Sequence, residues 1–445
     1  MTAMPRGNSA RQVAARVVAR AHDEGAFAAA VLDSELDRAV QLQGRDRALA
    51  TELVYGSLRV APWLDAEIGR FARSSAAIDR CVRAHMIVAA YQLFFTRVPA
   101  FAAVSEAVSS VRAERGQKVG AFANAILRRI AQHAVSAERP SRDAAVLAST
   151  PSWLRDALER ALSIDGAGAF LRCGEETPAV GLRVEHASER SVWLGRLREV
   201  VPSASFELGR ASPLAIVVRG AGNPEALPGY ADGEWSVQEE GAQVAALAVG
   251  AREGESVLDA CAGRGNKTAI LARAVGRSGA VDVCDIHPQK LERLATELRR
   301  LRLGARDAFA IDWAVGSGEL TRTYDRVLVD APCTGVGTLR RRPEIALRRR
   351  SEDLDAICRR QDAIVGRAAS HVRVGGTLVY VVCSVLKEEC EDRVNALLRA
   401  RVDFEPVPFD AADIQGVFGD ASGVRLLPNV HGTDGYFLAR LRRKA

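Results

Sequence analysis

From Val237 onward the sequence alternates short apolar runs with longer segments of helical pattern. Strands that alternate with helices in this way are typical of a parallel, doubly wound, Rossmann-like α/β sheet. A last apolar run from Gly435 to Leu441 predicts an antiparallel final strand. The expected strands are Ser256 to Ala260, Ala280 to Ile286, Ala308 to Ile311, Arg326 to Val329 and Thr377 to Val382, and the expected helices are Lys267 to Val275, Gln289 to Leu303, Glu352 to His371 and Glu388 to Ala400.

The first part of the chain shows helical periodicity instead, and almost no strand-like alternation interrupts it. We therefore expect an all-α domain over residues 1–135. Between residues 136 and 235, seven prolines punctuate short apolar runs, which predicts a small mixed α/β connector module before the α/β core of residues 236–445. The expected helices of the first domain are Arg11 to His22, Ala29 to Ala39, Arg45 to Phe71, Ile78 to Phe95, Ala103 to Glu114 and Val119 to His133.

Composition limits the class of protein. A chain of 445 residues with 48% hydrophobic residues is too long for one ordinary core. Its eight cysteines show no repeated spacing and no CxxC pair, which argues against a disulfide framework and a structural zinc. With neither a signal-peptide pattern nor a run of 18 apolar residues, we expect a cytoplasmic protein, monomeric, with no metal and no membrane contact. The net charge of +6 favours a polyanionic partner.

Two cysteines stand where predicted strands end at polar turns. Cys333 lies in Asp330-Ala-Pro-Cys-Thr-Gly, and Cys383 follows the run Leu378-Val-Tyr-Val-Val. Open α/β sheets place their reactive groups at these strand ends. A single buried cysteine is more often a small hydrophobic residue, but two thiols at neighbouring strand ends favour a chemical role.

The turn after the first strand of the α/β core contains two glycines, Gly263 and Gly265, before a helix. Such a turn lets a ligand approach the backbone, and the helix start offers free N–H groups to a negative group. A phosphate loop and a dinucleotide fingerprint both fail on spacing, which leaves a nucleoside with a carboxylate, as in S-adenosylmethionine. The candidate residues are Cys261, Ala262, Gly263, Arg264, Gly265, Asn266 and Lys267.

Acidic residues end three successive strands of this core. Asp259 ends the first strand, Asp285 the second and Asp312 the third. Asp285 can accept hydrogen bonds from ribose hydroxyls, and Asp312 from an adenine amino group. Each could instead cap a helix, but three acids beside a glycine turn favour a nucleoside site.

The two thiols suit methylation of a pyrimidine. Carbon 5 of the ring becomes nucleophilic only after a thiolate adds at carbon 6, and a second thiol could assist the later release. Ring nitrogen 3 must be protonated or hydrogen-bonded during the addition, and Asp330 is suitably placed for this.

Two arginine triplets follow the first cysteine turn. Arg340, Arg341 and Arg342 form the first, and residues 348–350 form the second. Guanidinium groups bind phosphate in a bidentate way, so a nucleic-acid contact is favoured here over a solvated loop.

These motifs together resemble the RNA 5-methylcytosine methyltransferases of the RsmB (Sun, Fmu) type, over nearly the whole chain. The shared segments are Gln238-Glu-Glu-Gly-Ala-Gln, Val257-Leu-Asp-Ala-Cys-Ala-Gly, Asp330-Ala-Pro-Cys-Thr-Gly-Val-Gly-Thr, Arg341-Arg-Pro-Glu-Ile and Gly376-Thr-Leu-Val-Tyr-Val-Val-Cys-Ser. The resemblance implies that Cys383 is the nucleophile and that Cys333 assists product release. It also implies an S-adenosylmethionine pocket lined by residues 261–267, Asp285, Asp312 and Asp330.

The helical part is similar to the NusB-type RNA-binding fold, through Phe122-Ala-Asn-Ala-Ile-Leu-Arg-Arg-Ile and Glu52-Leu-Val-Tyr-Gly. This makes Arg128 and Arg129 candidate RNA contacts, although a solvated helix end is an equally good interpretation. The expected activity is methylation of a cytosine in 16S ribosomal RNA. The alternatives are the same chemistry on tRNA or another RNA, and a non-catalytic RNA-binding assembly factor.

The chain departs from the family pattern at three places. The usual loop Ala-Pro-Gly-Gly-Lys-Thr is replaced by Gly263-Arg-Gly-Asn-Lys-Thr, Val382 stands where threonine commonly precedes the nucleophile, and Ala346 and Leu347 replace an aromatic residue. We expect cofactor binding to survive, because backbone N–H groups do not depend on the side chains.

Overall fold

The computed structural model describes residues 9–72, 78–136, 141–174, 178–411 and 414–444. The chain forms two compact units. The first contains residues 1–178 and 339–349, and the second contains residues 179–338 and 350–445. No helix in the described ranges is long and apolar enough to cross a bilayer.

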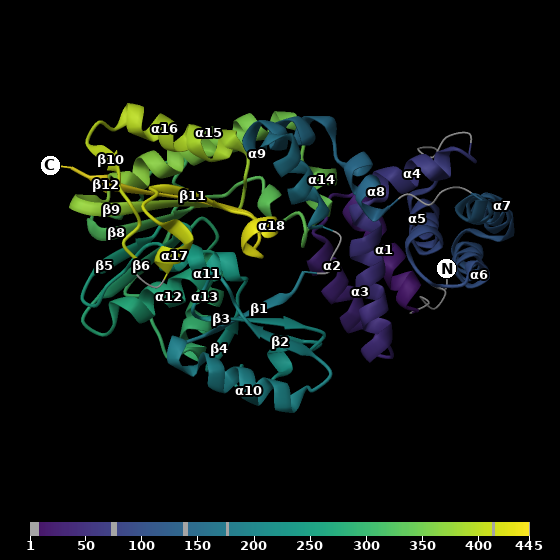
Figure 1. Ribbon diagram of the computed structural model, residues 1–445, viewed down its shortest axis with the longest axis horizontal. Coiled ribbons are helices and arrows are strands. Elements are labelled where there is room, and N and C mark those ends of the chain that lie inside the picture. Colours follow the sequence, from purple (N-terminus) through teal and green to yellow (C-terminus); the bar gives the residue numbers. More distant parts are fainter. Residues whose placement is uncertain (1–8, 73–77, 137–140, 175–177, 412–413, 445) are drawn as a thin grey trace. The chain divides into compact units, whose positions relative to one another are not determined.

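The first unit is all-α, as predicted (Figure 1). Its core forms around α5, whose Met86, Ile87, Ala90 and Tyr91 are almost fully buried. The helices are α1 (Ala10–Asp23), α2 (Ala28–Arg38), α3 (Gly44–Arg59), α4 (Ala61–Gly69), α5 (Arg80–Phe95), α6 (Ala100–Arg115), α7 (Gln117–Ser136), α8 (Arg142–Ser149), α9 (Ser152–Arg172) and α14 (Glu344–Arg348).

The single helix expected from Arg45 to Phe71 is wrong. Helix α3 ends at Arg59 and α4 begins at Ala61, with Val60 between them at φ −121° and ψ 19°. Pro62 occupies the first turn of α4, where its missing N–H costs nothing, whereas in a continuous helix it would break a hydrogen bond. The proline therefore starts a new helix.

Helices α8 and α9 occupy the stretch in which the prolines suggested a mixed module. Pro151 has φ −55° and ψ 143° and is the N-cap of α9, so it begins a helix rather than a turn between strands. The first strand starts only at Val180. The division into separate domains at residues 135 and 235 stays a prediction.

The second unit contains a small antiparallel sheet with strand order β2-β3-β1-β4. Trp193 and Leu197 of α10 pack with Phe206, Ile216 and Trp235 of the strands in one hydrophobic cluster. This sheet and its helix form the small mixed module that the sequence predicted. Its elements are β1 (Val180–Val184), α10 (Arg190–Val200), β2 (Ser205–Leu208), β3 (Ala215–Arg219) and β4 (Trp235–Val237), with short 3₁₀ turns at Ala187–Glu189 and Pro224–Ala226.

The large sheet has the order β10-β12-β9-β8-β5-β6-β7, with β11 paired to β12. Strands β5 to β9 pair in parallel, and β12 pairs antiparallel with β9, β10 and β11, which confirms the predicted mostly parallel sheet with an antiparallel last strand. The bounds are β5 (Ser256–Asp259), β6 (Ala280–Asp285), β7 (Ala308–Ala310), β8 (Tyr324–Asp330), β9 (Val372–Val382), β10 (Phe404–Pro406), β11 (Gly423–Leu426) and β12 (Tyr436–Arg443).

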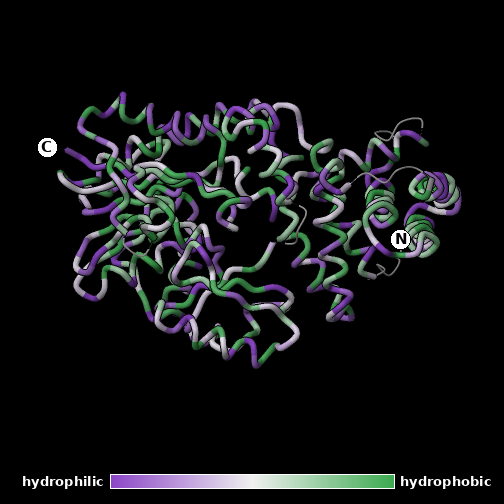
Figure 2. Tube along the Cα trace, in the orientation of Figure 1, coloured by the Kyte–Doolittle hydropathy of each residue, from purple (hydrophilic) through white to green (hydrophobic). Residues whose placement is uncertain are grey.

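Helices cover both faces of this sheet (Figure 1). α11 (Glu240–Leu247), α12 (Asn266–Val275) and α13 (Pro288–Arg300) share one core with the strands, and α15 (Ser351–Ala369) and α16 (Glu391–Ala400) share the other. Hydrophilic and hydrophobic residues alternate along many of the helices, as helices with one buried face require (Figure 2). The remaining short elements are Val336–Thr338, Lys387–Glu389, α17 (Gln415–Phe418) and α18 (Pro428–His431).

The order of the strands reverses beside β5. The chain adds β6 and β7 on one side of β5 and β8 and β9 on the other. In doubly wound sheets this switch point opens a crevice at the carboxyl ends of the strands, which is where ligands bind. The fold therefore brings together the turns that follow β5, β8 and β9.

Candidate active site

The two predicted cysteines meet at the carboxyl edge of the large sheet. Cys383 directly follows β9, and Cys333 lies three residues beyond the end of β8, its parallel neighbour. Their sulfur atoms are 3.2 Å apart, and both cysteines are half-buried and outside any disulfide. Adjacent strands thus place two thiols in direct contact.

The contact changes the acid–base properties of the Cys333 thiol. The neighbouring Cys383 sulfur and burial both raise the pKa of Cys333 well above its ordinary value. Cys333 therefore keeps its proton near neutral pH and can donate a hydrogen bond to the sulfur of Cys383.

An ion pair joins the predicted cofactor turn, residues 261–267, to the end of β8. Lys267, in the first turn of α12, donates to Oδ2 of Asp330 at 2.6 Å. Burial alone would lower the pKa of Lys267, but Asp330 and, more weakly, Cys383 and Asp259 raise it. Lys267 is therefore a cation beside the thiols. The sequence placed Lys267 only in the cofactor loop and missed this pairing, which the fold creates between distant segments.

The glycine turn after β5 presents backbone to open space. Gly263 has φ +59°, and a side-chain carbon added there would meet nothing within 4 Å. Gly265, at φ +90°, is the N-cap of α12 and packs tightly, because a carbon added there would lie 2.7 Å from Cγ of Leu294. The helix start has no side-chain cap, so its N–H groups can serve a negatively charged ligand.

Asp285 lies against this turn. Its Oδ2 accepts from the Gly263 N–H at 3.1 Å and its Oδ1 from the His287 N–H at 2.8 Å, with Lys290 Nζ 3.4 Å away. Asp312 accepts from the Ala314 N–H at 2.9 Å. Both acids thus accept local turn bonds without capping a helix, since the N-cap of α13 is His287 and the described residues directly after Asp312 start no helix, and Asp285 also contacts the predicted cofactor turn.

Beneath the turn, Asp259 is buried and Cys261 is half-buried. Asp259 is fully buried and accepts from the Thr268 hydroxyl at 2.8 Å, and burial raises the pKa of Asp259 to about 7. Burial, Asp330, Asp259 and Asp285 raise the pKa of the Cys261 thiol well above its ordinary value. Cys261 is therefore a neutral packing residue whose backbone shapes the turn.

Arg183 supports the cofactor turn from the small sheet, and the sequence did not reveal it. Its side chain is only 1% exposed and donates to the Asn266 carbonyl at 2.8 Å and to Gln238 Oε1 at 2.9 Å. It also pairs with Glu185 at 2.7 Å. A buried arginine so fully bonded fixes the start of α12.

The arginines predicted to contact RNA all lie in the first unit. Arg340 and Arg341 are half-buried, Arg342 is exposed, and the Arg340 carbonyl accepts from Arg59 at 2.9 Å. In the same segment Arg348 stacks 4.0 Å over the Phe27 ring. Part of this basic segment therefore packs on the helical unit. On α7, Arg128 and Arg129 are both exposed.

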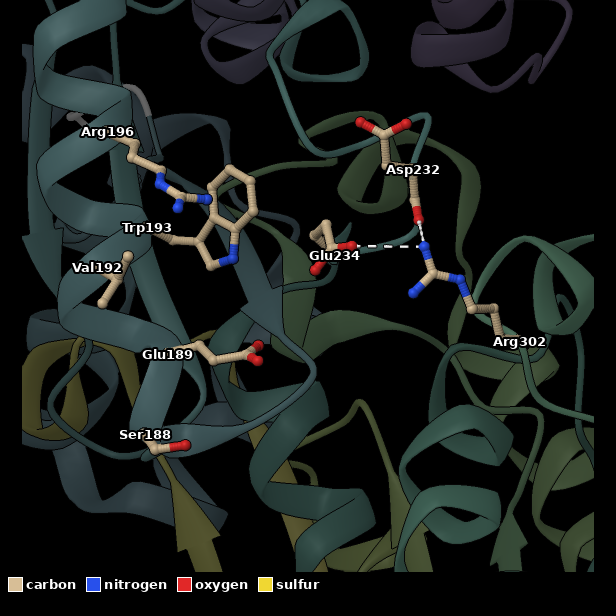
Figure 3. Close-up of a pocket in the computed structure, with 8 residues that line it drawn as sticks. All are labelled: Ser188, Glu189, Val192, Trp193, Arg196, Asp232, Glu234 and Arg302. Carbon is tan, nitrogen blue, oxygen red and sulfur yellow. Dashed lines mark hydrogen bonds and ion pairs between the residues drawn. The ribbon is translucent and has the colours of Figure 1, made fainter.

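A cavity of about 540 Å³ opens in the small-sheet module of the second unit (Figure 3). Acidic and basic side chains face each other across it, and Arg302 pairs with Glu234 at 3.5 Å. None of the predicted site residues lines it. Among the described residues, no group of three or more His, Cys, Asp or Glu side chains is arranged to hold a metal ion. The cavity is lined by Ser188, Glu189, Val192, Trp193, Arg196, Asp232, Glu234 and Arg302.

Comparison with known proteins places this geometry in a family. Residues 246–442 match the family described as "16S rRNA methyltransferase RsmB/F", and residues 8–132 match the NusB family. Ribosomal RNA small subunit methyltransferase B of Pectobacterium carotovorum is 30% identical over 97% of this chain and 98% of its own length. The protein of the same name from Escherichia coli K12 is 30% identical over 99% and 100%.

Solved structures agree on the fold. The crystal structure of PH0851 covers 99% of this chain and 100% of its own with a TM-score of 0.82 at 22% identity. NSun6 from Pyrococcus horikoshii covers 67% of this chain and 100% of its own with a TM-score of 0.57 at 18% identity. The predicted resemblance is confirmed: the chain belongs to the RsmB/F family of RNA 5-methylcytosine methyltransferases and carries a NusB-type domain at its N-terminus.

Proposed function

We propose that this protein methylates carbon 5 of one cytosine in 16S ribosomal RNA through a covalent bond between Cys383 and carbon 6 of the ring. The observation that carries the proposal is the contact of 3.2 Å between the Cys383 and Cys333 sulfur atoms. Addition and release of a covalent intermediate are separate steps, and a second thiol in contact with the nucleophile can serve the release.

The environment supports Cys383 as the nucleophile. Cys333 keeps its proton because its pKa is raised, and Lys267 supplies positive charge nearby. The Cys333 thiol can donate a hydrogen bond to the Cys383 sulfur, and the positive charge of Lys267 lies close to that sulfur, so both can stabilise negative charge that develops there during the reaction. As its sulfur bonds to carbon 6, the paired Lys267 and Asp330 can pass a proton to ring nitrogen 3. Once carbon 5 carries the methyl group, water or another base takes the proton from that carbon, the electrons of the C–H bond restore the double bond between carbons 5 and 6, and the carbon–sulfur pair leaves with the Cys383 sulfur, which the Cys333 thiol stabilises by a hydrogen bond.

The glycine turn fits S-adenosylmethionine. Gly263 faces open space and the start of α12 lacks a side-chain cap, so the backbone of residues 261–267 can hold the cofactor's carboxylate. Asp285 and Asp312 would accept from the ribose hydroxyls and the adenine amino group. When bound, S-adenosylmethionine supplies the methyl group.

Ribosomal RNA as the substrate is supported by the relatives named as small-subunit methyltransferases and by the NusB-type domain. The net charge of +6 and the exposed Arg128, Arg129 and Arg342 suit a polyanion.

The test is bisulfite sequencing of total RNA from a strain lacking the gene, complemented with the wild type or with Cys383→Ala. We expect one cytosine of the small-subunit RNA to lose protection in the deletion strain and to regain it only with the wild type. A changed tRNA cytosine with unchanged ribosomal RNA would assign the activity to tRNA. No change in any RNA, with no methyl incorporation from labelled cofactor, would leave only an RNA-binding role.

A further inference from the structure

A buried carboxylate lies behind the two thiols. Glu389 belongs to a charged run in the sequence, Lys387 to Asp392, which would ordinarily be solvated. Its side chain is 0% exposed. Removing a carboxylate from water is costly unless hydrogen bonds replace the lost solvation, so a residue kept in this position calls for a physical explanation.

Four donors from three segments surround the Glu389 carboxylate. Oε1 accepts from the Thr334 backbone N–H at 2.8 Å and from Gln361 Nε2 at 3.0 Å. Oε2 accepts from the hydroxyls of Thr334 and Ser384, each at 2.5 Å. The two oxygens of a carboxylate offer about four acceptor positions, so this one is fully used.

The donors are the immediate neighbours of the two thiols. Thr334 follows Cys333, and Ser384 follows Cys383. Gln361 on α15 also donates to the Pro332 carbonyl at 3.0 Å, on the other side of Cys333. One carboxylate therefore binds the turn after β8 and the turn after β9 at the same time.

The backbone of Glu389 is itself fixed. Its carbonyl accepts from the Tyr380 hydroxyl, inside β9, at 2.8 Å. The two turns are also joined directly, since the Gly337 N–H donates to the Cys383 carbonyl at 3.0 Å. This backbone bond joins the two turns. The Glu389 bonds are made to the residues next to Cys333 and Cys383, and they therefore fix the backbone from which each cysteine side chain extends.

We propose that Glu389 is a positioning residue, which holds Cys333 and Cys383 at the separation that the two-thiol reaction requires. The inference rests on the proposed function for its kinetic consequence, but not for its effect on the thiols themselves. Glu389 does not touch the substrate; it acts through Thr334 and Ser384. A displacement of about 1 Å in a reacting group can cost about 10²-fold in rate, which sets the expected size of the effect.

The experiment compares Glu389→Ala and Glu389→Gln in the full-length protein with Glu405→Gln as the matched control. Glu405 carries the same side chain but pairs with Arg442 at 2.5 Å, where its carboxylate is 34% exposed. We expect kcat to fall about 10²-fold for the alanine variant and about tenfold for the glutamine variant, which keeps the shape of the side chain. The KM values for RNA and for S-adenosylmethionine should change less than about twofold, and the control should behave as wild type.

A second measurement needs no RNA. The rates at which iodoacetamide alkylates Cys333 and Cys383 are followed by mass spectrometry as a function of pH. We expect Glu389→Gln to change the ratio of the two rates at least about fivefold. Thr334→Val should change the ratio similarly, whereas Thr334→Ser, which keeps the hydroxyl, should restore it.

The two measurements separate the possible failures. If the wild type methylates no RNA, the proposed substrate is wrong, and the alkylation ratio alone decides the role of Glu389. If Glu389→Gln keeps both the wild-type kcat and the wild-type ratio, the positioning role is overturned. The role is also overturned by a second outcome: in each variant kcat falls only in proportion to the fraction of folded protein, and the ratio of the two alkylation rates is unchanged. Glu389 would then contribute only to the stability of the fold.

Discussion

Two regions at the same edge of the large sheet are built in opposite ways. The turn after β5 (residues 261–267), where we propose that the cofactor binds, is open: Gly263 has a positive φ, and a side-chain carbon added there would meet nothing within 4 Å. The thiol edge after β8 and β9 is closed: its two sulfur atoms are in contact and its polar neighbours are buried and hydrogen-bonded.

The open turn suits the binding of a ligand, whereas the closed thiol edge suits a chemical reaction. A carboxylate held by N–H groups needs the shape of the backbone, so the turn tolerates Arg264 and Asn266 where the family pattern has other residues. A thiol must meet one carbon atom, so its neighbours have to fix it. Side-chain identity should therefore matter little in the turn, except where a glycine is required, and much at the thiol edge.

The largest expected effect in the turn comes from Gly265→Ala. Gly265 has φ +90°, and a methyl group there would lie too close to Leu294. The strained backbone and the overpacking should each lower the free energy of unfolding by about 1 to 3 kcal/mol. We expect the melting temperature to fall by roughly 5 °C or more and the affinity for S-adenosylmethionine to drop. Thermal unfolding followed by circular dichroism and calorimetric titration of the cofactor measure both.

Two variants in the same turn serve as controls. Gly263→Ala carries only the strain of its positive φ, because nothing lies within 4 Å, and should lower the melting temperature less than Gly265→Ala. Arg264→Ala removes an exposed side chain and should change the KM for the cofactor less than about threefold. If Arg264→Ala weakened cofactor binding more than Gly265→Ala, recognition by the backbone would be refuted.

A smaller effect concerns pH. Burial raises the pKa of Asp259 to about 7, well above the ordinary value for aspartate in an unfolded chain. Between about pH 4 and 7 the folded protein holds a proton that the unfolded chain has released, so this group lowers stability as pH rises through that window. The stability changes by about 1.4 kcal/mol per pH unit at most, the value for one proton. Below this window both states are protonated, and above it both are ionised.

Asp259→Asn removes the titration while keeping an acceptor for the Thr268 hydroxyl. Urea unfolding at several pH values should show a flatter dependence on pH in the variant than in the wild type. If the free energy of unfolding depended on pH with the same slope in both proteins, Asp259 would be ionised throughout this range, and a buried charge would lie beneath the turn of residues 261–267.

Much of the fold could be predicted because its signals are local. The alternation of apolar runs and helices after Val237 identifies the parallel sheet, and the run from Gly435 identifies its antiparallel last strand. Proline was the main source of error. Pro62 starts a new helix inside the single helix expected from Arg45 to Phe71, and Pro151 starts a helix in the stretch where the prolines predict a mixed module.

The only part of the site that the sequence could predict was the residues at the ends of predicted strands. Cys333 and Cys383 could be placed at neighbouring strands because each follows an apolar run. Glu389 could not be found, because a glutamate in a charged run has the pattern of a solvated turn. Two of its donors, Thr334 and Gln361, are distant from Glu389 in the sequence, and its burial appears only when the fold is formed. The same holds for Arg183, which the small sheet brings under the cofactor turn.

The central claim is that the two touching thiols have different roles, and covalent trapping tests it most directly. Cys333→Ser and Cys383→Ser are each incubated with small-subunit RNA and S-adenosylmethionine and separated on a denaturing gel. We predict that Cys333→Ser accumulates a protein–RNA adduct that resists denaturation, whereas Cys383→Ser forms none. An adduct with Cys383→Ser and none with Cys333→Ser would contradict the assignment of Cys383 as the nucleophile.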